Sequence, residues 1–207
     1  MDPRNRRVGG LVGLLLCSGF VLGGCGSSDG LVLRVDAEFN PVVGANQQVG
    51  LSEANRGVAQ SFTVLAAGKL EKFSLIITDG PSTDDGVIRI TVRPLNGMGE
   101  PDPDPASSII VPIDVDTSTL PATLVETFTE FFVGNDPGRE VLPGEKYAIV
   151  VDFVSRTGVD TAAIALVLGQ DDSAGDPYAG GTGWTGESMV GFTANTDDYI
   201  FRTYVLQ

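Results

Sequence analysis

Short runs in which hydrophobic and polar residues alternate follow one another along most of the chain. The clearest is "GVIRITVRP" at 86–94, in which Ile88, Ile90 and Val92 alternate with polar residues such as Thr91 and Arg93. Alternation with a period of two places successive side chains on opposite faces of a strand. We therefore expect this segment to be a strand with one face on a core and the other in water.

Similar runs occur from Leu31 to the C-terminus, separated by clusters of Gly, Pro, Asp and Asn. No segment after the N-terminal leader keeps the apolar spacing of an amphipathic helix. The pattern predicts an all-β fold of nine or ten strands in two packed antiparallel sheets, with helix limited to single turns. The other predicted strands are "VLRVDA", "VAQSFTVL", "GKLEKFSLIIT", "SSIIVPIDV", "LVETFTEFF", "EKYAIVVDF", "TAAIALVLG" and "DDYIFRTYVL".

Two segments fit this pattern less simply. In "LVETFTEFF" strict alternation places Phe128 and Phe132 on the same face as Glu130, so we expect a bulge to change the phase. In "NGMGEPDPDPAS", at 96–107, proline and acidic residues lie close together. This composition predicts a long, mobile, solvated loop between two strands.

The first residues differ from the rest of the chain. Arg4, Arg6 and Arg7 precede an apolar run of about 15 residues, Val8 to Leu22, and small residues follow. This order is typical of an export signal, and the run is shorter than the roughly 20 residues that span a bilayer. We predict a signal peptide at 1–24.

The leader ends in "LGGC", which resembles the lipobox of bacterial lipoproteins. The resemblance implies cleavage before Cys25, attachment of lipid to Cys25, and, because Gly26 rather than an aspartate follows, sorting to the outer membrane in a diderm. An ordinary secretory signal with a chance cysteine is the alternative. The predicted organisation is a signal peptide at 1–24, a lipidated cysteine with a short tether at 25–30, and a β-sandwich domain at 31–207, with a tether reach of at most ~17 Å.

Charge and composition limit the chemistry of the exported part. The chain has 13 basic and 27 acidic residues, and the leader removes three arginines and one aspartate, which leaves a net charge of −16. Such a charge argues against nucleic acid and anionic lipid headgroups as direct partners. The chain has no histidine, and its two cysteines are Cys17 in the leader and Cys25. Ser-His-Asp and Cys-His catalysis and the usual zinc sites are therefore excluded.

Four segments in a fixed order carry a second resemblance: "VAQSFTVLAAGKLEKFSLIIT", "LPGEKYAIVVDF", "GDPYAGGTGW" and "DDYIFRTYV". They are similar to the choice-of-anchor domains of bacterial surface proteins, which are related to carbohydrate-binding jelly rolls. The resemblance covers about Val58 to Val205 and has no counterpart for residues 40–57. It implies a β-sandwich of jelly-roll type that binds glycans or acts as a surface module.

Acidic residues are concentrated in the predicted loops. Asp171, Asp172 and Asp176 form the densest local group. Calcium prefers carboxylate and carbonyl oxygens, so this group is a candidate calcium site. The alternative is a set of solvated turn carboxylates that keep the surface soluble.

The loop "GDPYAGGTGW" contains Tyr178 and the chain's only tryptophan, Trp184. As an exposed pair, the two rings could stack on a sugar while Asp176 accepts hydrogen bonds from its hydroxyl groups. Large aromatic side chains are mostly buried, however, so we favour a loop that folds back and caps the sandwich. We expect its glycines to allow backbone conformations that other residues avoid.

The sequence thus predicts a non-catalytic cell-envelope lipoprotein that acts as a surface binding module or as a structural module. Its candidate partners are a glycan and envelope proteins, and calcium is its only candidate cofactor. Two other functions remain open. Paired carboxylates could hydrolyse a glycosidic bond, although no pair stands out by its local context. The chain could also be a subunit of an envelope assembly.

Overall fold

The computed structural model describes residues 31–40, 46–51, 56–78, 86–121, 128–134, 140–156, 164–169, 178–195 and 198–207. For 46–51, 56, 156 and 164–169 only the backbone is described. Residues 31–207 form one compact unit. The predicted signal peptide and Cys25 lie outside the described residues, and so do Asp171, Asp172 and Asp176.

The regular secondary structure of the described part is almost entirely β, and its two helical segments are single 3₁₀ turns, η1 (Pro105–Ser107) and η2 (Thr117–Thr119). This confirms the all-β prediction for these residues. No helix among them is long and apolar enough to cross a membrane. The strands are β1 (Leu33–Phe39), β2 (Asn46–Leu51), β3 (Arg56–Thr63), β4 (Gly68–Leu75), β5 (Ile77–Thr78), β6 (Gly86–Pro94), β7 (Ile113–Asp116), β8 (Thr129–Phe132), β9 (Glu140–Val141), β10 (Lys146–Arg156), β11 (Ile164–Gly169), β12 (Gly183–Glu187), β13 (Gly191–Ala194), β14 (Asp198–Tyr199) and β15 (Phe201–Leu206).

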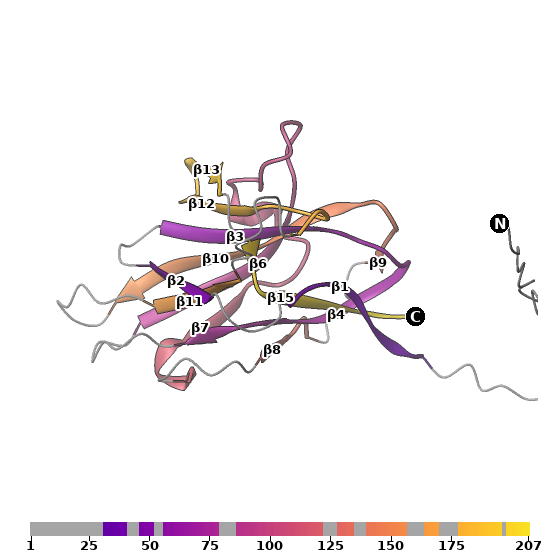
Figure 1. Ribbon diagram of the computed structural model, residues 1–207, viewed down its shortest axis with the longest axis horizontal. Coiled ribbons are helices and arrows are strands. Elements are labelled where there is room, and N and C mark those ends of the chain that lie inside the picture. Colours follow the sequence, from indigo (N-terminus) through magenta and orange to yellow (C-terminus); the bar gives the residue numbers. More distant parts are fainter. Residues whose placement is uncertain are drawn as a thin grey trace, which may run out of the picture. The chain divides into compact units, whose positions relative to one another are not determined.

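The strands form two packed layers, and every strand pairing is antiparallel (Figure 1). One layer is a six-stranded sheet in the order β13-β12-β3-β10-β6-β7. The other contains a five-stranded sheet, β1-β15-β4-β8 with β9 beside β4, and a four-stranded sheet, β14-β11-β2 with β5 beside β11. Only Ile76 separates β4 from β5 and only Ile200 separates β14 from β15, so the four-stranded sheet continues the five-stranded one. The predicted two-sheet sandwich is confirmed.

The core lies between the layers and is rich in aromatic rings. Ile88, Ile90 and Val92 of β6 all face it, as the period-two pattern predicts. On the opposite layer, the ring of Phe201 lies 6.0 Å from that of Phe62, measured between centroids, so it bridges the two sheets. Side chains from both sheets therefore interdigitate, as in other sandwiches.

The other face of β6 is not the solvated face that the pattern predicts. Thr91 and Arg93 are both fully buried. The segment 96–107, predicted to be a solvated loop, instead folds back along the sheet. Leu95 forms a β-bridge with Pro101, and the Asp102 N–H donates to the Pro94 carbonyl (3.0 Å). The prediction is wrong because alternation along one strand does not reveal that a later segment covers its polar face.

The segment 129–132 keeps strict alternation and needs no bulge. Phe131 is buried against Phe73, with ring centroids 5.5 Å apart, whereas Phe132 points outward and is 63% exposed. Glu130 is exposed as well. The shared face of Phe132 and Glu130 is therefore real, and the bulge expected there is absent from 129–132.

Strands β2, β9, β12 and β13 were not predicted.

Phe201 and Phe132 provide a matched test of the packing, because the first is buried and the second is exposed. Phe201→Ala removes a fully buried ring between the layers and is expected to lower the free energy of unfolding by about 3–5 kcal/mol. Phe132→Ala removes an exposed ring and is expected to change that free energy by no more than about 0.5 kcal/mol. Urea denaturation of both variants measures the difference. Equal losses would contradict the assignment of inner and outer faces.

Candidate functional site

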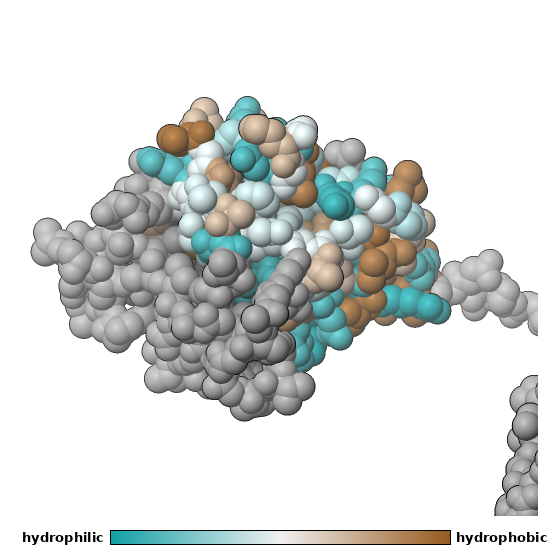
Figure 2. All heavy atoms as spheres, turned by 45° about the horizontal axis from the view of Figure 1, so that its top comes forward, coloured by the Kyte–Doolittle hydropathy of each residue, from teal (hydrophilic) through white to brown (hydrophobic). Residues whose placement is uncertain are grey.

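The face of the six-stranded sheet that is turned away from the core, hereafter the covered face, has its own small apolar cluster. Trp184 of β12 lies opposite Ala59 of β3, and Ala59 lies opposite Val150 of β10. Together with Ala148 and Phe192 these residues form a buried group separate from the main core. Figure 2 brings β12 and β13 toward the viewer and shows hydrophobic atoms on this side only in small groups.

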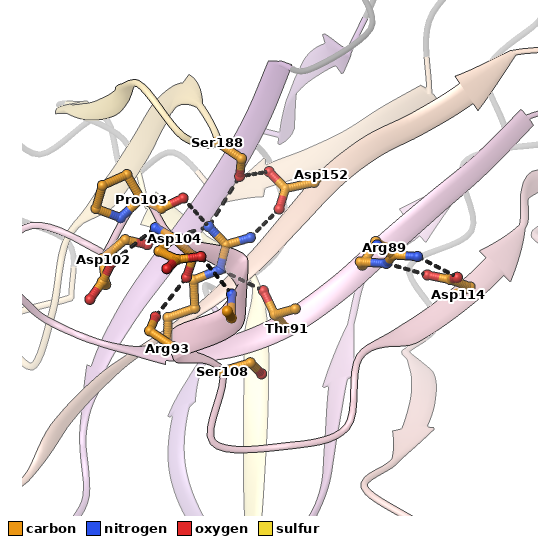
Figure 3. A network of polar contacts seen from close by, with 12 residues as sticks. Arg89, Thr91, Arg93, Asp102, Pro103, Asp104, Ser108, Asp114, Asp152 and Ser188 are labelled. Atoms are coloured by element: carbon orange, nitrogen blue, oxygen red, sulfur yellow. Dashed lines mark hydrogen bonds and ion pairs between the residues drawn. The ribbon is translucent and has the colours of Figure 1, made fainter.

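Arg93 lies on the covered face and is completely buried. Its guanidinium forms an ion pair with Asp152 of β10, and its Nε–H donates to Thr91 Oγ1 (2.8 Å). Its Nη1 donates to Ser188 Oγ (3.0 Å) and to the carbonyl of Pro103 (3.3 Å), among other acceptors (Figure 3). Burial lowers the pKa of Arg93, and the carboxylate of Asp152 acts in the opposite direction.

These contacts connect three separate parts of the chain over one sheet. Ser188, in the turn between β12 and β13, donates to Asp152 and accepts from Arg93. The next residue, Met189, donates its N–H to the Pro103 carbonyl (2.9 Å). Buried charges are tolerated only when they are paired and hydrogen-bonded. The ion pair therefore fixes the 102–103 segment and the 188–189 turn on the covered face.

Arg89, on the same face of β6, has a different environment. It forms a bidentate ion pair with Asp114 of β7, at 2.7 and 2.8 Å, and both side chains are well exposed. The hydrogen bond to Asp114 raises the pKa of Arg89, and the same bond lowers the pKa of Asp114. The predicted wet face of β6 is thus present only at Arg89.

The loop with the two aromatic residues is fastened to β3 by Ser61. The Ser61 Oγ accepts hydrogen bonds from Thr182 N–H (2.8 Å) and from Trp184 Nε1–H (3.2 Å). Thr63 Oγ1–H donates to the Gly180 carbonyl (2.8 Å). The indole is 8% exposed. Trp184 is thus packed rather than displayed, although it packs on the covered face and not over the end of the sandwich.

Glycine is required in this loop for space, not for backbone conformation. Gly180, Gly181 and Gly183 all lack the positive φ that the sequence analysis expected. A Cβ on Gly181 would instead lie 1.8 Å from the Ser61 carbonyl oxygen, and one on Gly180 would lie 2.6 Å from the Tyr178 ring. A residue with a side chain at position 181 would collide with the backbone of β3, so glycine is needed there for the loop to lie this close to the strand.

Tyr178 is half-buried at the start of this loop. Its ring meets Phe201 edge-on at 5.1 Å and lies 6.2 Å from Phe39. Its N–H donates to Asp198 Oδ2 (3.1 Å), and the buried Gln60 donates to Asp198 Oδ1 (2.8 Å). Burial raises the pKa of Tyr178 to about 12. Tyr178 is therefore part of the packed domain, at the join between β3, β14 and the loop.

A polar hollow of about 230 Å³ lies where this loop approaches the turn after β6. One wall is the peptide backbone of the loop at 179–182, and Lys146, the first residue of β10, belongs to another. Lys146 lies opposite Thr63 in the sheet, and it forms no ion pair with a carboxylate of the described residues. The remaining residues around the hollow are Ser61, Phe62, Leu95 and Gly99.

The predicted site residues have different outcomes. Tyr178 and Trp184 both belong to the fastened loop, and neither lines the hollow. Asp176 falls outside the described residues, so its role as a ligand contact stays a prediction. The calcium site of Asp171, Asp172 and Asp176 stays one too, and the described residues contain no group of three or more acidic, histidine or cysteine side chains placed to hold a metal.

None of the four residues Arg93, Asp152, Ser61 and Lys146 was predicted from the sequence to be a site residue. One available signal was the absence of histidine, which leaves lysine and arginine as the only cationic side chains of the domain. An arginine in the middle of a strongly alternating strand was another. Neither signal reveals that Arg93 is covered or that Lys146 borders a hollow, because both depend on segments distant in sequence.

Arg93 and Arg89 allow a matched test of the buried ion pair. Arg93→Met leaves Asp152 buried without its cation and is expected to lower the free energy of unfolding by about 3–5 kcal/mol. Arg89→Met breaks an exposed pair on the same strand and is expected to change it by less than about 1 kcal/mol. Replacing Asp152 by leucine in addition to Arg93→Met is expected to restore most of the loss, since no charge then remains buried. Chemical denaturation of the three variants measures their free energies of unfolding. Equal losses in Arg93→Met and Arg89→Met would contradict the buried ion pair.

The raised pKa of Tyr178 predicts a loss of stability at alkaline pH. The unfolded tyrosine releases its proton near pH 10.0 and the folded one near pH 12. Between these values the unfolded state binds fewer protons, so the free energy of unfolding falls as the pH rises, and it is unaffected by this group below pH 10.0. We expect a smaller decline in Tyr178→Phe, measured by urea denaturation across this interval. An identical decline in both proteins would show that another group is responsible.

The chain has no counterpart among the known proteins with which it was compared. No protein-family model matches it, no curated protein matches it, and no solved structure matches it. The strands of the described residues establish an all-β sandwich of two antiparallel layers. Because no relative indicates a function, the site is interpreted from its own chemistry.

Proposed function

We propose that this protein is a non-catalytic lipoprotein of the bacterial cell envelope, anchored through Cys25, whose sandwich domain binds a glycan carrying a carboxylate in the hollow beside Lys146. The observation that carries the proposal is a lysine without an ion pair among the described carboxylates, on the wall of a polar hollow, in a very acidic chain. An anionic group is the natural partner of that lysine.

The walls of the hollow suit recognition rather than catalysis. Around Lys146 the described lining consists of the loop residues 179–182 together with Ser61, Phe62, Leu95 and Gly99, and none of these residues carries a carboxylate. Ser61 and Thr63 fix the loop at 179–182 by binding the Thr182 N–H and the Gly180 carbonyl. Other peptide groups of the same loop would bond the sugar hydroxyls. A rigid loop loses little conformational freedom on binding, which favours affinity.

The size of the hollow limits the ligand. At about 230 Å³ it is smaller than the roughly 300–1,000 Å³ of pockets that enclose drug-sized molecules. It therefore accommodates one sugar unit or the end of a chain. A uronic acid is the class that combines hydroxyl groups with a carboxylate.

Two resemblances in the sequence agree with this function. The "LGGC" site supports a lipid anchor at Cys25, at the surface of the outer membrane in a diderm. The order of segments similar to choice-of-anchor domains supports a jelly-roll connection of the strands and a surface role. Hydrolysis of a glycan is the less favoured alternative, because no acid is found among the described residues that line the hollow.

The binding proposal is tested with uronic acids and the lysine. Lys146→Met removes a charge-assisted hydrogen bond worth about 1.5–3 kcal/mol, so we expect affinity for glucuronate oligosaccharides to fall about 10- to 100-fold. Lys69→Met, a half-exposed lysine on the other layer, is the matched control and is expected to bind like the wild type. Calorimetric titration measures all three proteins, with glucose oligosaccharides as the neutral comparison. Equal binding by wild type and Lys146→Met, or stronger binding of the neutral sugar, would refute a carboxylate site at Lys146.

A further inference from the structure

The outer face of the five-stranded sheet carries a row of side chains that is unusual for a solvated surface. The strand register places Val35 opposite Tyr204, Tyr204 opposite Lys72, and Lys72 opposite Phe132, across β1, β15, β4 and β8. Paired residues of antiparallel strands lie on the same face of a sheet. Three of the four are apolar or aromatic. The row includes one residue from each of β1, β15, β4 and β8, which are neighbours in this order in one sheet (Figure 1).

The contacts within the row keep its apolar parts at the surface. Lys72 Nζ lies 4.4 Å from the centroid of the Tyr204 ring and 5.7 Å from that of Phe132. Phe132 is 63% exposed and Val35 is 49% exposed. Beside the row, the guanidinium of Arg202 lies 4.1 Å from the ring centroid of Phe128. Lysine and arginine side chains that lay their stems along apolar groups and keep their charged heads in water suit a lipid–water interface.

The start of the domain extends this apolar surface. Leu31, Val32 and Leu33 are all exposed, and Leu31 is 72% exposed. Leu33 belongs to β1, the edge strand that also carries Val35. Five residues separate Leu31 from Cys25, a length that reaches at most ~17 Å. A lipid on Cys25 would hold these side chains close to a bilayer.

The ion pairs on this outer face do not repel an anionic bilayer. Lys72 pairs with Glu130 at 2.5 Å, and Arg202 pairs with Glu38 at 2.9 Å. These two ion pairs carry no net charge, whereas the predicted mature chain carries −16. The strongest repulsion from anionic headgroups therefore arises elsewhere on the domain.

We propose that the outer face of the five-stranded sheet, defined here by Val35, Tyr204, Lys72 and Phe132, rests on the lipid bilayer that holds the anchor. The proposal depends on the lipid anchor of the proposed function, not on the glycan. The hollow at Lys146 belongs to the covered face of the opposite layer, because Lys146 and Ser61 alternate in register with the residues of that face. A domain seated on this face therefore presents the hollow away from the membrane, toward ligands outside it.

Tryptophan fluorescence in brominated lipid tests the orientation. The full-length lipidated protein is placed on phosphatidylcholine vesicles with or without brominated acyl chains. Phe132→Trp puts a reporter on the proposed face, and Met98→Trp puts one on the loop that covers the opposite layer. Both positions are exposed, so both variants are expected to fold. Wild type measures the background from the buried Trp184.

We expect the added emission of Phe132→Trp to fall about twofold in brominated vesicles, because an interfacial face lies about 5–10 Å deep at the headgroup boundary, and the emission of Met98→Trp to stay unchanged. Equal quenching of both reporters, or quenching of neither in protein that floats with the vesicles, overturns the proposed face while the anchor stands. A dimer formed through this face, detected by sedimentation with no quenching, also overturns it. Protein that fails to float with the vesicles refutes the anchor, and the membrane-resting face is then refuted with it.

Discussion

The buried ion pair between Arg93 and Asp152 imposes the strongest constraint on this domain. A guanidinium without solvent must have a carboxylate and several further acceptors, and these are supplied by strands and turns far apart in the sequence. The pair also requires space next to the sheet. A Cβ on Gly57 of β3 would lie 2.6 Å from Asp152 Oδ1, so glycine at this position makes room for the carboxylate. The covered face thus depends on one charge and on the residues that surround it.

A sheet covered on both faces explains how the rest of the domain is organised. The inner face of the six-stranded sheet packs on the aromatic core, and the outer face is closed by the 96–107 segment, the 188–189 turn and the glycine loop. The hollow beside Lys146 is the place on this face where the glycine loop and the turn after β6 approach each other. On the outer face of the other layer, the described residues form a row of aromatic and aliphatic side chains of which Phe132 and Val35 are exposed. The two sides of the sandwich therefore differ in chemistry, which agrees with the proposal that the domain lies between a membrane and an external ligand.

Much of the fold follows from local pattern, and most of the site does not. Alternation identified β6, β10 and β15, because a buried face repeats every second residue. It failed at Thr91, Arg93 and the 96–107 segment, where burial comes from contacts between distant parts of the chain. It also missed β12 and β13, whose sequence is rich in glycine. One of these glycines, Gly186, is explained by close packing against the Gly191 carbonyl and Phe192. The loop with Tyr178 and Trp184 was recognised from composition, but its attachment to Ser61 and its proximity to Lys146 depend on the pairing of β3 with β12.

Hydrogen exchange of the full-length protein tests most directly whether the outer face of the six-stranded sheet is closed by fixed segments. The amides of Asp102, Thr182 and Met189 all lie outside the strands, and each donates to an acceptor across this face, at 3.0, 2.8 and 2.9 Å. Our account predicts that they exchange as slowly as amides of β3 and β10, through opening of the whole domain. Exchange at the rate of an unprotected peptide would show that these segments are mobile loops, and would contradict the closed face and the hollow at its rim.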